Sequence, residues 1–207
     1  MFNLRNFGTP FFVGGKMFEK LREEVRKRVT PKRYIHILGV EEKAAELGKK
    51  YGADESKVRT AAILHDVAKS MSVDELERIC REEYSDELTP EDIEITPILH
   101  GFVGEYIAKK EFGIEDRDIL DGIKYHTIGK KGLGIVGRII YIADAIEKNR
   151  DYPGVEELRY ETDRDLDGGI ISEINHKDQY LKKTGGKSHR NTLEMRDWLI
   201  ESRQRRN

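Results

Sequence analysis

The stretch TAAILHDVAKS, residues 60–70, places two polar side chains in an apolar segment that has the composition of a buried helix. His65 and Asp66 are flanked by alanine, isoleucine, leucine and valine. An unpaired buried carboxylate costs several kcal/mol, which is comparable to the net stability of a small domain. Two explanations are open: Lys69, one turn further on, pairs with Asp66, or the two polar side chains bind a group that compensates the charge.

Helix signals extend in both directions from this segment. Thr30 followed by Pro31 predicts a helix start, and Gly52 follows the end of the same apolar pattern. Ser72 and Glu75 have the spacing of a capping box. Helices are expected at residues 17–29, 31–51, 55–69, 73–83, 97–112, 117–126, 135–149, 165–183 and 192–203. No segment alternates over five or six residues, so the sequence predicts an all-α domain without a sheet.

Length and composition exclude several classes of protein. A chain of 207 residues suffices for one substantial core. The 37 basic and 39 acidic residues argue against a general nucleic-acid binder, because such proteins carry a basic excess. The single cysteine, Cys80, excludes an internal disulfide framework and fits a reducing, cytoplasmic location. No apolar run is long enough to span a membrane. The glycines of residues 132–137 do not follow a strand, which excludes a dinucleotide-binding turn.

Six polar residues interrupt apolar stretches in five of the predicted helices or at their ends. These residues are His36, His65, Asp66, His100, His126 and Asp144. So many ionisable groups directed to the inside of one bundle are expected to meet there. Imidazole nitrogens and carboxylate oxygens are ligands of iron, manganese, zinc and related divalent metals, and a metal ion would compensate Asp66. The sequence therefore predicts a metal site in the core of the bundle, whereas His176 lies among charges and is expected at the surface.

The spacing of His36, the pair His65-Asp66 and Asp144 resembles the H…HD…D signature of the HD superfamily of metal-dependent phosphohydrolases. Further segments, similar in order and approximate spacing over residues 32–196, resemble the bacterial symmetrical diadenosine tetraphosphate hydrolases of that superfamily. These segments are RYIHILGV, LHDVAKS, LHGFVGEYIAKKEFGI, IKYHTIGKKG, IIYIADAIEKNRDYPGVEELR and GKSHRNTLEMR. The resemblance implies an HD-domain helical bundle that holds iron, or alternatively manganese, magnesium or another divalent metal. It also implies symmetrical cleavage of dinucleoside tetraphosphates into two nucleoside diphosphates.

The resemblance assigns roles to individual residues. The implied metal ligands are His36, His65, Asp66 and Asp144, and the number of ions is one or two. The resemblance implies that His100 and His126 face the phosphates or a second metal, and together with Asp66 and the candidate counter-charge Lys69 they are the predicted catalytic residues. The implied nucleotide-binding residues are His36, Asp66, His100, His126, Asp144, Arg150, Lys187, His189 and Thr192. In the last segment the family usually reads IHP, whereas this chain reads SHRN.

The chemistry that this reaction needs matches the residue types present. Phosphoanhydride hydrolysis requires an in-line nucleophile and neutralisation of charge on the transferred phosphoryl group. A ligated metal ion polarises a phosphate oxygen and lowers the pKa of water. His100 and His126, when protonated, can donate to phosphate oxygens or to the leaving group, and Lys69 and Arg150 are candidate counter-charges.

Alternatives remain at this stage. The chain could be another HD-domain hydrolase, such as a 5′-nucleotidase, a triphosphohydrolase or a phosphodiesterase. A metal- or nucleotide-binding module without catalysis is a second alternative, supported only by the basic tail ESRQRRN. The expected partner is a small nucleotide substrate, with no membrane and no specific nucleic acid, and a homodimer is the assembly considered. Residues 1–16 lack a helical pattern and are predicted to be a dispensable extension, so that the domain spans residues 17–207.

Overall fold

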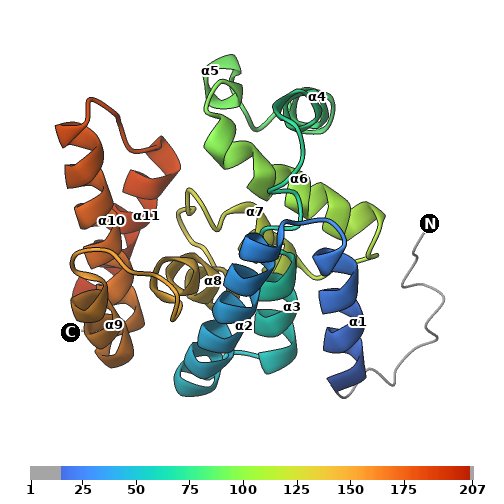
Figure 1. Ribbon diagram of the computed structural model, residues 1–207. Helices are drawn as coiled ribbons and strands as arrows, with labels where there is room; N and C mark the ends of the chain where they lie inside the picture. The colour runs from blue at the N-terminus through green and yellow to red at the C-terminus, as the bar shows by residue number, and fades with distance from the viewer. Residues whose placement is uncertain (1–14, 206–207) are drawn as a thin grey trace.

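The computed structural model describes residues 15–205, which form eleven helices and no strand (Figure 1). The helices are α1 (Gly15–Arg26), α2 (Pro31–Tyr51), α3 (Glu55–Leu64), α4 (Val73–Glu83), α5 (Pro90–Ile93), α6 (Thr96–Lys110), α7 (Arg117–Lys124), α8 (Ile135–Ile146), α9 (Val155–Arg164), α10 (Leu166–Lys183) and α11 (Arg190–Gln204). None of these helices is both long and apolar enough to cross a membrane. The all-α prediction is confirmed. The predicted extension lies almost entirely outside the described residues.

Several helix ends follow from the capping residues in the sequence. The Thr30 side chain accepts a hydrogen bond from the first turn of α2, and Gly52 ends that helix with a φ of 71°, which glycine adopts without a steric penalty. Ser72 and Glu75 form the expected capping box of α4. The predicted starts and ends of α2 and α4 are therefore correct.

The helix that carries the HD pair ends earlier than predicted. α3 stops at Leu64, with His65 as its C-cap, and residues 65–70 form consecutive turns. The reason is local: the amide of Val67 donates to the carbonyl of Leu64, three residues back, and Lys69 does the same to Asp66. His65 and Asp66 therefore lie at a helix end and not in mid-helix. In these turns the two adjacent side chains can both be directed to the same cluster of metal-ligand atoms.

Other element predictions need correction as well. α8 ends at Ile146, three residues before the predicted end. The helix predicted to begin at residue 97 is α6, which begins at Thr96; Ile95 takes the N-cap position, and its side chain makes no capping hydrogen bond. The helices α5 and α9 were not predicted. α5 has only four residues, and α9 is mostly charged, so neither shows an apolar period.

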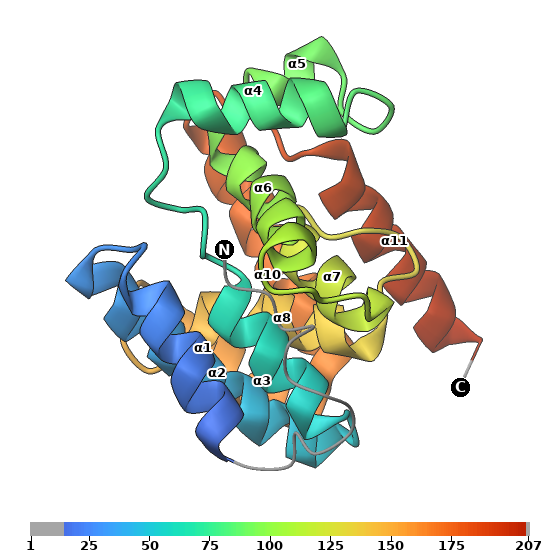
Figure 2. The same ribbon diagram turned by 90° about the vertical axis from the view of Figure 1, so that its right-hand side faces the viewer.

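Helix α8 occupies the middle of the molecule and contacts α2, α3, α7 and α10. Figures 1 and 2 show α1–α3 on one side of it, α4–α6 above, and α9–α11 on the side of the C-terminus. Ile139 and Ile140 of α8 are fully buried, and each such side chain stabilises the fold by about 1.5–3 kcal/mol. Asp144 therefore projects from one of the most firmly packed elements of the fold.

A glycine sets the distance between α6 and α7. A Cβ atom at Gly101 would lie 2.6 Å from the carbonyl oxygen of Lys124, so only glycine permits this approach of the two backbones. His100 precedes Gly101, and His126 follows Lys124 by two residues. The close approach brings the Nε2 atoms of the two histidines to 3.0 Å.

Candidate metal centre and adjoining cavity

Four histidines and two carboxylates converge where α2, α6, α7 and α8 surround the end of α3. The donor atoms of His36, His65 and Asp144 lie within 4.8 Å of one another, and so do those of His65, Asp66 and His126. The His36 Nε2 atom is 3.0 Å from Asp144 Oδ1 and 3.7 Å from Asp66 Oδ2. The structure thus brings together all four residues expected to bind metal.

Two of the imidazoles present nitrogen atoms that no protein group satisfies. His36 Nε2 and His65 Nε2 are buried, and neither makes a hydrogen bond in the described part of the chain. A carboxylate lies beside each nitrogen, at 3.0 Å between His36 Nε2 and Asp144 Oδ1 and at 3.4 Å between His65 Nε2 and Asp66 Oδ2, but without hydrogen-bond geometry. On the opposite ring edge, His65 Nδ1 donates to the carbonyl of Ala62 at 2.6 Å, and His36 Nδ1 lies 3.1 Å from Glu147 Oε1. A proton on Nδ1 leaves the Nε2 lone pair free, which is the form in which imidazole binds metal. The residues present fit a divalent cation.

Both candidate carboxylate ligands are held in the ionised form. Burial raises the pKa of Asp66, but the neighbouring His65 and His100 outweigh burial and hold the pKa well below its usual range. Burial acts in the same way on Asp144, where the nearby His36 is the main group that lowers the pKa far below its ordinary value. Two carboxylates that remain charged so close together favour a cation between them.

His100 and His126 differ in what they can offer. Burial lowers the pKa of His126 to about 3 and also lowers that of His100, so both rings are neutral near pH 7. His126 Nδ1 donates to the carbonyl of Ile123 at 2.7 Å, which leaves its Nε2 as an acceptor. His100 Nε2 lies 3.0 Å from that acceptor and 3.1 Å from Asp66 Oδ1, so His100 carries the proton. The sequence analysis assigned His100 and His126 the same role, whereas in the structure His100 Nε2 is a hydrogen-bond donor and His126 Nε2 is an acceptor.

An arginine that the sequence analysis missed compensates Asp66. The Nη1 atom of Arg33 lies 2.8 Å from Asp66 Oδ2, whereas Lys69 Nζ lies 3.2 Å from His100 Nδ1. The alternative of a simple Lys69–Asp66 salt bridge is therefore wrong. A signal was available, because Arg33 precedes His36 by three residues and shares its helix face.

The second carboxylate also has an arginine, and His36 has a buried acid. Arg150 Nη2 lies 2.7 Å from Asp144 Oδ1, and Arg150 Nε donates to the Asp144 carbonyl at 2.8 Å. Glu147, only 1% exposed, fixes the ring of His36 and accepts from the amide of Asn149 at 2.7 Å. Glu147 follows Asp144 by three residues, a spacing that sequence reasoning did not use.

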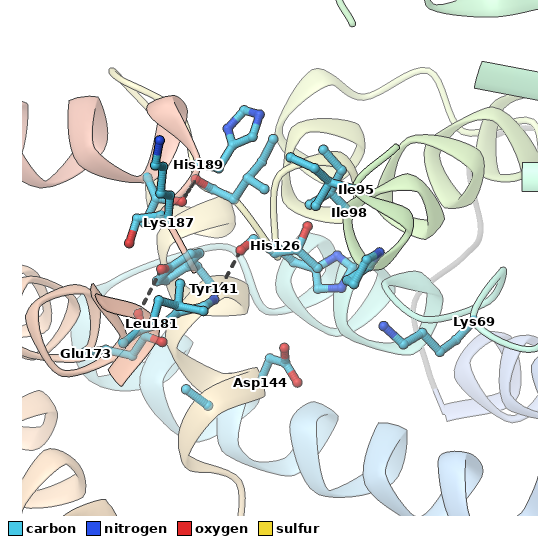
Figure 3. A pocket seen from close by; sticks show the side chains of 17 residues that line it. Lys69, Ile95, Ile98, His126, Tyr141, Asp144, Glu173, Leu181, Lys187 and His189 are labelled. Carbon is cyan, nitrogen blue, oxygen red and sulfur yellow. Dashed lines mark hydrogen bonds between the residues drawn. The ribbon is translucent and has the colours of Figure 1, made fainter. Parts of the chain in front are cut away.

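A cavity of about 340 Å³ opens beside the candidate metal centre (Figure 3). Lys69, His126 and Asp144 line one part of it. The loop before α11 and the start of that helix line another part, through the predicted nucleotide-binding residues Lys187, His189 and Thr192. The other predicted nucleotide-binding residues do not line the cavity: His36, Asp66, His100 and Arg150. Three of them, His36, Asp66 and His100, are buried behind its wall.

Two of the predicted nucleotide contacts have structural tasks. The Thr192 hydroxyl donates to the carbonyl of Ile128 at 2.7 Å and is buried. His189 caps α11 by accepting from the amide of Asn191, and its Nε2 lies 3.1 Å from Asp92 Oδ1. These two side chains shape the wall, and Lys187 is the exposed member of the group. His176 is exposed, as predicted.

Residues 33–149 match the family model described as HD domain, and this segment contains all four candidate metal ligands. The chain is 38% identical over 177 residues to the symmetrical bis(5′-nucleosyl)-tetraphosphatase of Bacillus subtilis, a match that covers 85% of this chain and 94% of the relative. The chain belongs to this family of HD-domain hydrolases. The resemblance seen in the sequence motifs is thereby confirmed.

A further relative and a solved structure support the same family assignment. The symmetrical bis(5′-nucleosyl)-tetraphosphatase of Halalkalibacterium halodurans is 38% identical over 183 residues, which cover 87% of this chain and 96% of the relative. A crystal structure from Clostridium acetobutylicum, described as a predicted HD superfamily hydrolase involved in NAD metabolism, is similar with a TM-score of 0.85 and 37% identity. That similarity covers 89% of this chain and 97% of the other.

Proposed function

We propose that this HD-domain protein hydrolyses dinucleoside tetraphosphates, such as diadenosine tetraphosphate, symmetrically into two nucleoside diphosphates. The observation that carries the proposal is the pair of unsatisfied, buried imidazole nitrogens of His36 and His65 beside two ionised carboxylates, at the edge of a cavity of nucleoside size. The names of the relatives that cover most of the chain support this substrate class.

The proposed metal ligands are His36, His65, Asp66 and Asp144, with iron as the proposed metal and manganese or magnesium as alternatives. A bound divalent ion supplies Lewis acidity to a phosphate and acidifies water. The second cluster, in which His126 joins His65 and Asp66, supports a site for a second ion.

Outside the metal ligands, His100 and Lys69 form a unit. Lys69 Nζ lies 3.2 Å from His100 Nδ1 and 3.3 Å from His100 Nε2. The acceptors Asp66 Oδ1 and His126 Nε2, at 3.1 and 3.0 Å from His100 Nε2, place the N–H of His100 on Nε2. We infer that this N–H, which faces Asp66 Oδ1 and His126 Nε2 behind the cavity wall, turns to a phosphate oxygen when substrate is bound, and that the Lys69 and Arg150 charges offset those of the substrate.

Product analysis separates this function from its alternatives. Purified protein is incubated with diadenosine tetraphosphate and Fe²⁺ or Mn²⁺, and the products are resolved by chromatography. ADP as the sole product is expected. ATP with AMP would exclude symmetrical cleavage, and activity on AMP or ATP alone would indicate a 5′-nucleotidase or a triphosphohydrolase. Binding without any product would favour a non-catalytic module. A homodimer and a cytoplasmic location stay predictions.

A further inference from the structure

The cavity contains a carboxylate that neither the metal centre nor a phosphate explains. Glu173 of α10 is half-buried and accepts a hydrogen bond from the Tyr141 hydroxyl through its Oε2 at 2.7 Å (Figure 3). Within residues 15–205 no basic group lies within 4.0 Å of this carboxylate; Lys177, one turn further on, directs its Nζ to the carbonyl of Thr127 at 3.4 Å. Burial raises the pKa of Glu173, as expected for an acid without a salt bridge.

The second carboxylate oxygen therefore keeps acceptor capacity that the protein does not use. This oxygen faces the cavity and its solvent, so a ligand that supplies a donor there replaces a hydrogen bond to water, whereas a ligand without a donor loses that hydrogen bond. A phosphate is disfavoured as the group that meets this oxygen, because like charges repel. The neutral donors of a nucleotide are the ribose hydroxyls and the N–H groups of the base.

The position of Glu173 in the cavity favours a ribose hydroxyl over an N–H group of the base as the donor. Its partner Tyr141 precedes Asp144 by three residues on α8, so the Tyr141–Glu173 pair lies about one helical turn from the metal centre. In Figure 3, Glu173 lies on the same side of the cavity as Asp144, and Ile95, Ile98 and His189 lie on the opposite side. In a nucleotide the sugar lies between phosphate and base. A phosphate at the metal centre thus places the sugar near Glu173 and the base toward the apolar wall.

We propose that Glu173 accepts a hydrogen bond from a ribose hydroxyl of the nucleotide half that occupies the cavity, and so selects ribonucleotides over deoxyribonucleotides. This inference rests on the proposed function and adds a specificity-determining residue to it. Acidic side chains read the ribose 2′-hydroxyl in the same chemical way in dinucleotide-binding folds.

The test compares ribose with deoxyribose in two measurements. The first is the KM and kcat of diadenosine tetraphosphate and of its analogue with 2′-deoxyriboses. The second is binding of ADP, 2′-deoxy-ADP and 3′-deoxy-ADP to the metal-loaded protein by calorimetry. The wild type is expected to prefer the ribonucleotide by about 10- to 100-fold, the range of a hydrogen bond to a charged group. Glu173→Ala should reduce that preference to less than about threefold, with kcat for the ribonucleotide little changed.

Matched variants keep the result decisive. Glu173→Gln preserves size and one acceptor, so it should lose only part of the preference. Glu157→Gln, an exposed acid of α9 remote from the cavity, should behave as the wild type. Equal losses for ribose and deoxyribose ligands in Glu173→Ala would overturn the inference, and so would a changed preference for adenine over guanine with ribose selection intact. If ADP binds but no tetraphosphate is cleaved, the proposed function fails, while the ADP comparison still decides the role of Glu173.

Discussion

The candidate metal centre and the cavity wall differ in how their side chains are held. At the metal centre His65, His100 and His126 are at most 2% exposed, and contacts with neighbouring protein groups fix the tautomer of each ring. At the wall, Lys187 is exposed on a loop, and the Asp92–His189 contact joins that loop to the short helix α5. The comparison suggests that the packed half determines the reaction and the wall determines which nucleotide binds.

The largest loss of metal and of activity is expected when His65 is replaced. His65→Ala removes a buried ligand that belongs to both candidate metal groups. Metal content, measured by mass spectrometry of the purified protein, and hydrolysis should fall together, by more than the roughly 100-fold seen when only a supporting residue is lost. His176→Ala, in an exposed position on α10, is the control and should change neither. Full metal content in His65→Ala would contradict the proposed centre.

The second prediction separates His100 from His126. His100→Ala removes the N–H that faces the site and should lower turnover by about 10²–10⁴-fold while metal is retained. His126→Ala removes an acceptor nitrogen, so it should lose metal if a second ion binds there. Metal analysis and single-turnover rates on both variants test this difference. Identical behaviour of the two variants would contradict the different roles assigned to the two rings, in which His100 is a donor toward Asp66 and His126, held by Ile123, is an acceptor.

A smaller loss of metal affinity is expected when Glu147, which contacts the proposed ligand His36, is changed. Glu147→Gln keeps the shape of the side chain but weakens its hold on His36 Nδ1, and metal affinity should fall by about 10- to 100-fold. Metal titration with a competing chelator measures this change. Glu42→Gln, which breaks only the exposed pair with Lys148, provides the control. Unchanged affinity in Glu147→Gln would mean that packing alone orients the ring.

At the wall, Asp92 should affect binding and acid stability more than turnover. Asp92→Asn weakens the contacts to His189 and Arg190 and should raise KM by up to about tenfold, or about 1.4 kcal/mol, with kcat unchanged. Burial opposes the ionisation of Asp92, but hydrogen bonds from Thr89 and Arg190 outweigh it and lower the pKa. A lowered acid pKa stabilises the fold above the unfolded value of about 3.9, and that stabilisation is lost as the pH falls further.

Thermal melts at several pH values test this sign. The difference in melting temperature between the wild type and Asp92→Asn should be constant at neutral pH and shrink below about pH 4. A difference that grows on acidification would contradict the assigned role of Asp92.

The residues of the metal centre could be predicted from the sequence more completely than those of the cavity wall. His36, His65 and Asp144 were found because a buried polar residue in an apolar run is a local signal, which needs no knowledge of the fold. Glu147 was missed because its importance depends on His36 in another helix. Arg33 shares a helix face with His36, but its partner Asp66 lies in another segment, so the spacing alone did not reveal its task. The break in the helix after Leu64 was missed because the apolar pattern and the helix propensity continue beyond it through Val67 and Ala68.

The same limit applies to the wall and explains why its residues are harder to assign. His189 was predicted to contact the nucleotide, but the structure also makes it the N-cap of α11 and the partner of Asp92. Glu173 was not singled out at all, since one acid in the charged segment of α10 has nothing local to distinguish it. Only the tertiary contact with Tyr141 places it in the cavity.

The smallest effect should come from Lys187, the exposed basic residue of the wall. An ion pair in water contributes only about 0–1 kcal/mol, because solvent and salt screen it. Lys187→Ala should therefore raise KM by no more than about fivefold, with kcat unchanged, and the difference should disappear near 1 M salt, where the screening length is about 3 Å. Steady-state kinetics at low and high ionic strength measure both effects, with Lys183→Ala, another exposed lysine at the end of α10, as the control. A loss of turnover comparable to that of His100→Ala would place Lys187 on the reacting phosphates and would remove the distinction between the two regions.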